Sequence, residues 1–186
     1  MSEESIHPNR DETAPSEEPK KKRRTMPAQK PATSEQVVVT PDDLIQAVSL
    51  RFGPIAADLA ALETNAKAPT YLGPDHARED FRDALKVPWA DVFPRGNLWL
   101  NPEFSDLAKY VEKCAEESKK REGFILQLGP ASVGANYFQD FNMKHGFVLL
   151  LSPRVQFVGH THPYPKDLAL TVFGYGLTGI APWRWK

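Results

Sequence analysis

The sequence predicts one α/β domain, built on a mainly parallel β-sheet with an antiparallel edge and preceded by a charged, disordered tail. From residue 37 onward, short apolar segments alternate with amphipathic ones, which is typical of a parallel sheet covered on both faces. Two closely spaced apolar segments near the end of the chain indicate the antiparallel edge. The length of 186 residues fits a single folded domain, which we place at residues 37 to 186.

Residues 1 to 36 are rich in Glu, Lys, Pro and Ser and carry almost no large apolar side chains. Such a segment cannot bury enough surface to offset its ordering entropy, so we expect disorder. Within it, five consecutive basic residues run from Lys20 to Arg24, after an acidic stretch. This basic run is either an arm that contacts DNA phosphates or part of a solvated, self-neutralising tail.

The composition excludes several classes of protein. The single cysteine, Cys114, rules out an intramolecular disulfide and is expected in the core. The longest apolar run, Phe147 to Leu151, is too short to span a bilayer. The acidic, polar N-terminus does not resemble a secretory signal. We therefore expect a cytoplasmic protein without membrane contact.

The first elements are a helix and a strand. Thr40 is expected to cap the helix and Pro41 to occupy its first position. Its apolar side chains recur at helical spacing, namely Leu44, Ile45, Val48 and Phe52. Gly53 ends the helix, and the segment from Ile55 to Leu59 predicts a short buried strand. Residues 63 to 90 are expected to be irregular.

Asn97 to Leu100 predicts the next strand, and Ser105 is expected to cap a second helix that ends at Gly123. One more strand and helix follow, and the chain then ends in a strand-rich part. The remaining expected elements are a strand at Phe124 to Leu128, a helix at Ala135 to Lys144, and strands at Phe147 to Leu151, Arg154 to Val158 and Leu168 to Tyr175.

The most informative motif is Asn101-Pro102-Glu103-Phe104, directly after the strand that ends at Leu100. Open α/β sheets bind ligands at the carboxyl ends of their strands. A polar side chain, a proline and an aromatic ring at such a position therefore indicate a binding or catalytic loop.

This motif and its surroundings resemble the phage DNA N-6-adenine-methyltransferase family. The resemblance runs from Thr40 to Phe173, in the order of that family. The matching segments are Thr40 to Leu44 with Arg51-Phe52-Gly53, Ala57 to Ala61 with Asn65-Ala66-Lys67 and Tyr71, Trp89, Leu126 to Ala131 with Tyr137-Phe138, Arg154 to Phe157, and Leu168 to Phe173.

The resemblance implies a Rossmann-like methyltransferase fold that transfers methyl from S-adenosylmethionine to adenine in double-stranded DNA. The Asn101 side-chain oxygen and the Pro102 carbonyl would hold the two hydrogens of the adenine amine, so that the nitrogen lone pair points at the methyl group. Phe104 would stack on the flipped base. Asp58 would lead the cofactor site, together with Asn65 and Lys67.

Two departures from the family leave an alternative open. Glu103 replaces the second proline of the usual signature, and no Phe-x-Gly-x-Gly turn, the usual cofactor fingerprint, appears in the sequence. The alternative is a catalytically weak or inactive relative that binds DNA or the cofactor. A third hypothesis is methylation of a different amine, in cytosine or in a protein glutamine.

Other polar and aromatic groups are weaker candidates. His160 and His162 would share one face of a strand, but no third ligand accompanies them. We therefore expect no metal site there and favour a loop that faces DNA. Trp183 and Trp185 either close the core or stack on bases.

Overall fold

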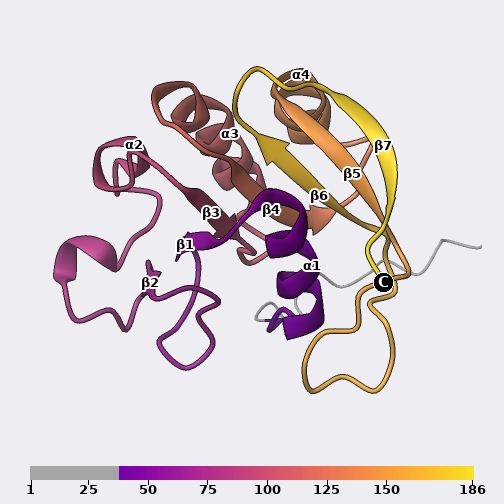
Figure 1. The fold of residues 1–186 in the computed structure, drawn as a ribbon, viewed down its shortest axis with the longest axis horizontal. Helices are drawn as coiled ribbons and strands as arrows, with labels where there is room; N and C mark the ends of the chain where they lie inside the picture. Colours follow the sequence, from indigo (N-terminus) through magenta and orange to yellow (C-terminus); the bar gives the residue numbers. More distant parts are fainter. Residues whose placement is uncertain (1–37) are drawn as a thin grey trace, which may run out of the picture. The chain divides into compact units, whose positions relative to one another are not determined.

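The computed structural model describes residues 38–186, all within one compact unit (Figure 1). The tail at residues 1 to 36, with its basic run from Lys20 to Arg24, lies outside the described residues. The described part is a seven-stranded sheet with helices on both sides. The strands are β1 (Ile55–Asp58), β2 (Thr70–Tyr71), β3 (Asn97–Leu100), β4 (Ile125–Pro130), β5 (Gly146–Ser152), β6 (Leu168–Phe173) and β7 (Gly179–Arg184).

The α-helices are α1 (Asp42–Phe52), α2 (Trp89–Val92), α3 (Leu107–Glu117) and α4 (Met143–His145). Two short 3₁₀ turns, η2 (Glu79–Phe81) and η3 (Ser118–Lys120), and a π-helical turn, η4 (Phe138–Asn142), complete the described elements. Within residues 38–186, no helix is both long and apolar enough to cross a bilayer.

The sheet order is β2-β1-β3-β4-β6-β5-β7. The neighbouring strands β2, β1, β3 and β4 are all parallel, which confirms the mainly parallel sheet. The antiparallel pairing lies in the other half, where β6 runs opposite to both β4 and β5. The outermost strand there, β7, is again parallel to its neighbour β5. The mixed sheet explains how the late apolar segments are accommodated without a further crossover helix.

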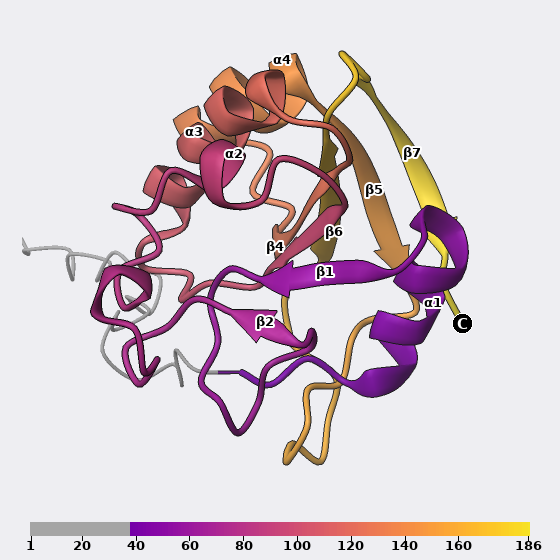
Figure 2. The same cartoon turned by 60° about the vertical axis from the view of Figure 1, so that its left-hand side comes forward.

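Both faces of the interior strand β3 are covered, because all four of its residues are buried. Leu98 and Leu100 pack with Val111 and Cys114 of α3 in one apolar cluster. Trp99 points to the opposite face and packs in the cluster that includes residues of α1. Helices α2, α3 and α4 therefore lie on one side of the sheet and α1 on the other (Figure 2). A strand buried on both faces is largely apolar, and β3 has one polar residue, Asn97, whose Nδ2 donates to the carbonyl oxygen of Phe52 (2.8 Å).

Three expected helix boundaries are wrong. The first helix begins at Asp42 after Pro41, and Thr40 does not cap it. The helix expected after Ser105 is α3, which begins at Leu107 with Asp106 rather than Ser105 at its N-cap position. Neither α1 nor α3 has a side-chain cap. Helix α3 ends at Glu117, before Gly123, because a 3₁₀ turn follows. No side chain caps the first N–H groups of either helix, so the candidate cap residues in the sequence predict the wrong starting residues.

Three expected elements also differ. Arg154 to Val158 forms no strand, although Val155 and Phe157 are buried. The alternation of apolar residues there reflects a loop that packs two side chains against the core. The expected helix at residues 135 to 144 is a π-helical turn followed by the single turn α4. The segment expected to be irregular contains the short strand β2, whose two residues are too few to give a periodic signal.

Candidate active site

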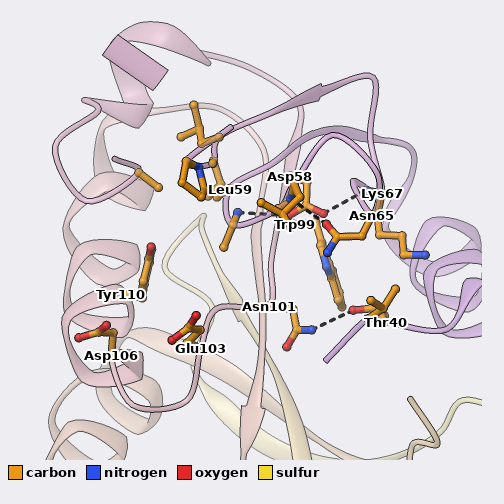
Figure 3. A pocket seen from close by; sticks show the side chains of 18 of the residues that line it. Thr40, Asp58, Leu59, Asn65, Lys67, Trp99, Asn101, Glu103, Asp106 and Tyr110 are labelled. Carbon is orange, nitrogen blue, oxygen red and sulfur yellow. Dashed lines mark hydrogen bonds between the residues drawn. The ribbon is translucent and has the colours of Figure 1, made fainter. Parts of the chain in front are cut away.

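A cleft of about 420 Å³ opens at the carboxyl ends of β1 and β3, between the segment before α1 and the start of α3 (Figure 3). Four residues singled out in the sequence, Asp58, Asn65, Lys67 and Asn101, all line it. They come from two neighbouring parallel strands and the loop after the first of them. A cleft of this size is typical of small-molecule sites, and its position is the one where open α/β sheets bind ligands.

Asp58 is the last residue of β1 and is only 3% exposed. Its Oδ1 accepts a hydrogen bond from the backbone N–H of Ala60 (3.2 Å), and its Oδ2 accepts one from the N–H of Lys67 (3.0 Å). Burial raises the pKa of Asp58 to about 6, against the lowering effect of these two bonds and of the Lys67 charge. Removal from water disfavours the ionised form, so this carboxylate is poised to gain from a cationic ligand.

Asn65 and Lys67 shape the loop around Asp58. The side-chain oxygen of Asn65 accepts a hydrogen bond from the N–H of Leu62 (2.8 Å), which closes the turn after β1. Lys67 directs its Nζ to Asp42 of α1 at 2.6 Å. The amine of Lys67 is therefore engaged by α1, and its backbone N–H is the group that contacts Asp58.

Gly73, which follows β2, allows the loops after β1 and β2 to approach closely. A Cβ atom at this position would lie 1.7 Å from the carbonyl oxygen of Ala61. The backbone N–H of Ala61 also donates to the carbonyl of Leu72 (3.0 Å). A glycine is thus required at this wall of the cleft, where backbone meets backbone.

Asn101 follows β3 and lines the same cleft. Its Nδ2 donates hydrogen bonds to the carbonyl oxygen of Val38 (3.0 Å) and to Thr40 Oγ1 (3.1 Å). Its Oδ1 is buried and has no hydrogen-bond partner among the described residues. A buried acceptor without a partner is costly, and such atoms in native structures call for an explanation. A ligand that donates a hydrogen bond would remove that cost.

Pro102 and Phe104 do not line the cleft directly. Pro102 is buried, and Phe104 is partly buried between the two apolar clusters on either face of the sheet. The Phe104 ring meets the ring of Tyr164 edge-on, at 5.7 Å between centroids. The structure therefore brings Asn101 together with Asp58, Asn65 and Lys67, and it places Phe104 beside the loop after β5.

The α3 side of the cleft is acidic. Glu103 and Asp106 line it near Tyr110 (Figure 3), and Asp83, from the loop after η2, lines the cleft as well. Burial, together with the charges of these three carboxylates, raises the pKa of Tyr110 to about 12. The sequence places Tyr110 on the apolar face of α3, which gives no indication of its part in the cleft.

The two basic residues that line the cleft are both engaged. Lys67 pairs with Asp42, and the Nε of Arg82 donates to the carbonyl oxygen of His76 (2.9 Å). Four carboxylates, those of Asp58, Asp83, Glu103 and Asp106, line the cleft against these two cations, so the cleft is predominantly acidic and favours a ligand with positive charge.

Comparison with protein families supplies the context for this cleft. A family model described as DNA N-6-adenine-methyltransferase (Dam) matches residues 28–167, which include every residue that lines the cleft. The chain belongs to this family. A comparison with curated proteins gives no match.

Dam family membership confirms the resemblance drawn from the sequence and gives DNA adenine methylation as the family's activity. The family's methyl donor, S-adenosylmethionine, is cationic at sulfur. The residues present fit such a group, because the cleft combines an acidic side, a buried carboxylate at Asp58 and an unpartnered acceptor at Asn101.

The weaker candidates lie away from the cleft. His160 and His162 line a separate hollow of about 210 Å³ in the loop between β5 and β6. Within residues 38–186, no group of three metal-binding side chains is present. Trp183 and Trp185 are buried in the cluster around α1, so they close the core. Cys114 is fully buried, and burial raises its thiol pKa, so it is no nucleophile.

Proposed function

We propose that this Dam family member transfers a methyl group from S-adenosylmethionine to N6 of adenine in double-stranded DNA, in a phage or prophage setting within the bacterial cytoplasm. The observation that carries the proposal is the buried, unpartnered Oδ1 of Asn101 at the end of β3, in a residue that lines the cleft. An adenine amine is a hydrogen-bond donor, which is the partner that this oxygen lacks.

The site residues have distinct roles in this proposal. Asn101 Oδ1 and the carbonyl of Pro102 accept the two amine hydrogens, so the N6 lone pair is directed at the methyl donor. Asp58, together with the loop around Asn65 and Lys67, binds the donor. Alignment of the reacting atoms supplies most of the acceleration, because the amine lone pair is otherwise delocalised into the ring.

The bond changes are those of a single displacement. When bound, S-adenosylmethionine would supply a methyl group on cationic sulfur; transfer to N6 would form the C–N6 bond, break the C–S bond with its electron pair left on sulfur, and release one N6 proton to water. Phe104 is proposed to contact the base that is taken out of the duplex. Phe104 is partly exposed and its ring lies next to Tyr164, which is compatible with that contact.

The test is methyl transfer from tritiated S-adenosylmethionine to duplex DNA, with the full chain. A duplex that contains adenine is compared with one built only of guanine and cytosine, and the labelled nucleoside is identified after digestion. Label in N6-methyldeoxyadenosine supports the proposal. Label in cytosine in both duplexes would assign a different amine and contradict it.

The alternative is a relative that binds the donor or DNA without efficient transfer. It is favoured by Glu103, whose carboxylate lines the cleft where family members carry proline. Equilibrium binding of S-adenosylmethionine without label in any duplex would select this alternative.

A further inference from the structure

The side chain of Asn101 is held by a segment that lies about sixty residues earlier in the chain. Its Nδ2 donates to the Val38 carbonyl at 3.0 Å and to Thr40 Oγ1 at 3.1 Å. Thr40 is only 3% exposed, and both partners line the cleft. Figure 3 shows the nitrogen of the Asn101 side-chain amide directed at the Thr40 side chain. The position expected to cap α1 thus serves the site.

These two bonds determine which way the Asn101 amide faces. A backbone carbonyl can only accept a hydrogen bond, so the NH₂ of Asn101 must face Val38. The Thr40 hydroxyl accepts from the same NH₂ group and strengthens that orientation. The oxygen Oδ1 is then directed away from both partners, and it is the atom left without a hydrogen bond.

The segment from Val38 to Thr40 is itself fixed. The carbonyl oxygen of Val39 accepts a hydrogen bond from the N–H of Val158 (3.0 Å), in the loop after β5. On its other side the segment leads directly into α1, where the Pro41 carbonyl accepts from the N–H of Leu44 (3.2 Å). The amide of Asn101 is therefore held by a segment whose own backbone is hydrogen-bonded on both sides of Thr40.

We propose that Thr40 is a positioning residue for methyl transfer, whose hydroxyl orients the Asn101 amide so that Oδ1 is available to the adenine amine. The inference rests on the proposed function of Asn101. Hydrogen-bond partners that orient a ligating side chain contribute substantially to its action, although they touch neither substrate nor cofactor.

The chain offers a matched control in its core. Asn142 Nδ2 donates to Thr171 Oγ1 (2.7 Å) and to Gln127 Oε1 (3.0 Å), and Asn142 Oδ1 is also buried without a described partner. Thr171 is as buried as Thr40, at 1% exposure, but neither Asn142 nor Thr171 lines the cleft. Thr171→Val therefore removes the same kind of bond at a site with no part in the reaction.

The experiment compares wild type, Thr40→Val, Thr40→Ser and Thr171→Val in the full chain. Thr40→Val keeps the shape and removes the acceptor, and we expect kcat to fall about tenfold with the dissociation constant of S-adenosylmethionine nearly unchanged. Thr40→Ser keeps the hydroxyl and should restore most of kcat. Thr171→Val should lose stability but keep kcat.

A second readout does not depend on activity. The side-chain amide resonances of Asn101, assigned by their loss in Asn101→Asp, should shift and exchange faster with water in Thr40→Val but not in Thr171→Val. Unchanged resonances in Thr40→Val would overturn the inference. A wild-type kcat in Thr40→Val would also overturn it. So would a loss of kcat in Thr40→Ser or Thr171→Val as large as the loss in Thr40→Val. A wild type that methylates no adenine refutes the proposed function, and the resonances then decide the orientation by themselves.

Discussion

Lys67 Nζ lies 2.6 Å from Asp42 Oδ1, and this ion pair joins the loop after β1 to the first turn of α1. Asp42 is 90% exposed, so the pair is worth at most about 1 kcal/mol. Because the Lys67 amine is engaged here, we expect Lys67→Met to weaken S-adenosylmethionine binding by less than about threefold and stability by less than about 1 kcal/mol. Calorimetric titration and thermal unfolding measure both. A loss of about a hundredfold in affinity would show that the amine leaves Asp42 to bind the donor.

Asn101→Ala removes both the acceptor and the bonds to Val38 and Thr40. We expect methyl transfer to fall by about 10²–10³, the usual loss when one oriented transition-state contact is removed. Asn142→Ala is the matched control, because it deletes a buried asparagine of the same bonding pattern away from the cleft. It should destabilise the fold and leave kcat intact. Turnover near the wild-type value in Asn101→Ala would remove Asn101 from the mechanism.

Asp58 should make donor binding dependent on pH. Burial raises its pKa to about 6, so the carboxylate is largely ionised at pH 7.5 and largely protonated at pH 5. If the ionised form binds the cationic donor, affinity should fall about tenfold between these two pH values. Titrations of wild type over this range measure the effect. Asp58→Asn should bind weakly and without this dependence, whereas an equally steep dependence in Asp58→Asn would assign the titration to another group.

The same shift has a defined effect on the free energy of unfolding. Because the folded-state pKa of Asp58 is raised from 3.8, the folded state binds the proton more tightly than the unfolded state. The resulting stability is fully present below about pH 4 and is lost as the pH rises through about 6. Denaturant titrations at pH 4 and pH 7 measure the free energy of unfolding of wild type and of Asp58→Asn. Between these two pH values, wild type should lose stability relative to Asp58→Asn, because the other carboxylates contribute equally to both proteins.

Glu103→Pro tests the residue that departs from the family signature. Glu103 is exposed, and among the described residues its backbone N–H donates to no other backbone group, so a proline ring removes no such bond. We expect methyl transfer equal to or above that of wild type, since the loop is stiffened. Glu103→Gln separates the effect of charge from that of the ring. A proline variant that folds and binds the donor but turns over clearly more slowly would assign Glu103 a role of its own.

The sequence was most informative where polar residues directly follow buried strands. Asp58 and Asn101 could be placed at one edge of the sheet, because the carboxyl ends of parallel strands lie together. The part played by Thr40 could not be predicted, since its bond to Asn101 joins residues 61 positions apart and depends on tertiary packing. Tyr110 was missed for a related reason, because helical periodicity marks it only as a core position.

Local patterns failed where packing replaced regular hydrogen bonding. The alternation from Arg154 to Val158 predicts a strand, but the segment packs Val155 and Phe157 into the core as a loop. The expected cap residues Thr40 and Ser105 are not used, although each lies within two residues of a helix start. In both cases the tertiary packing, and not the adjacent sequence, determines which hydrogen bonds the backbone forms.

The position of β6 bears on where this chain can be cut. The family match ends at residue 167, one residue before β6 begins, yet β6 lies between β4 and β5 and pairs with both. A fragment that stops at the matched boundary would contain every cleft residue and would still lack the strand that joins the two halves of its sheet. Two long apolar strands would then present unpaired edges, which are templates for association between chains. The matched segment thus contains the whole cleft, whereas the continuity of the sheet depends on a strand beyond that boundary.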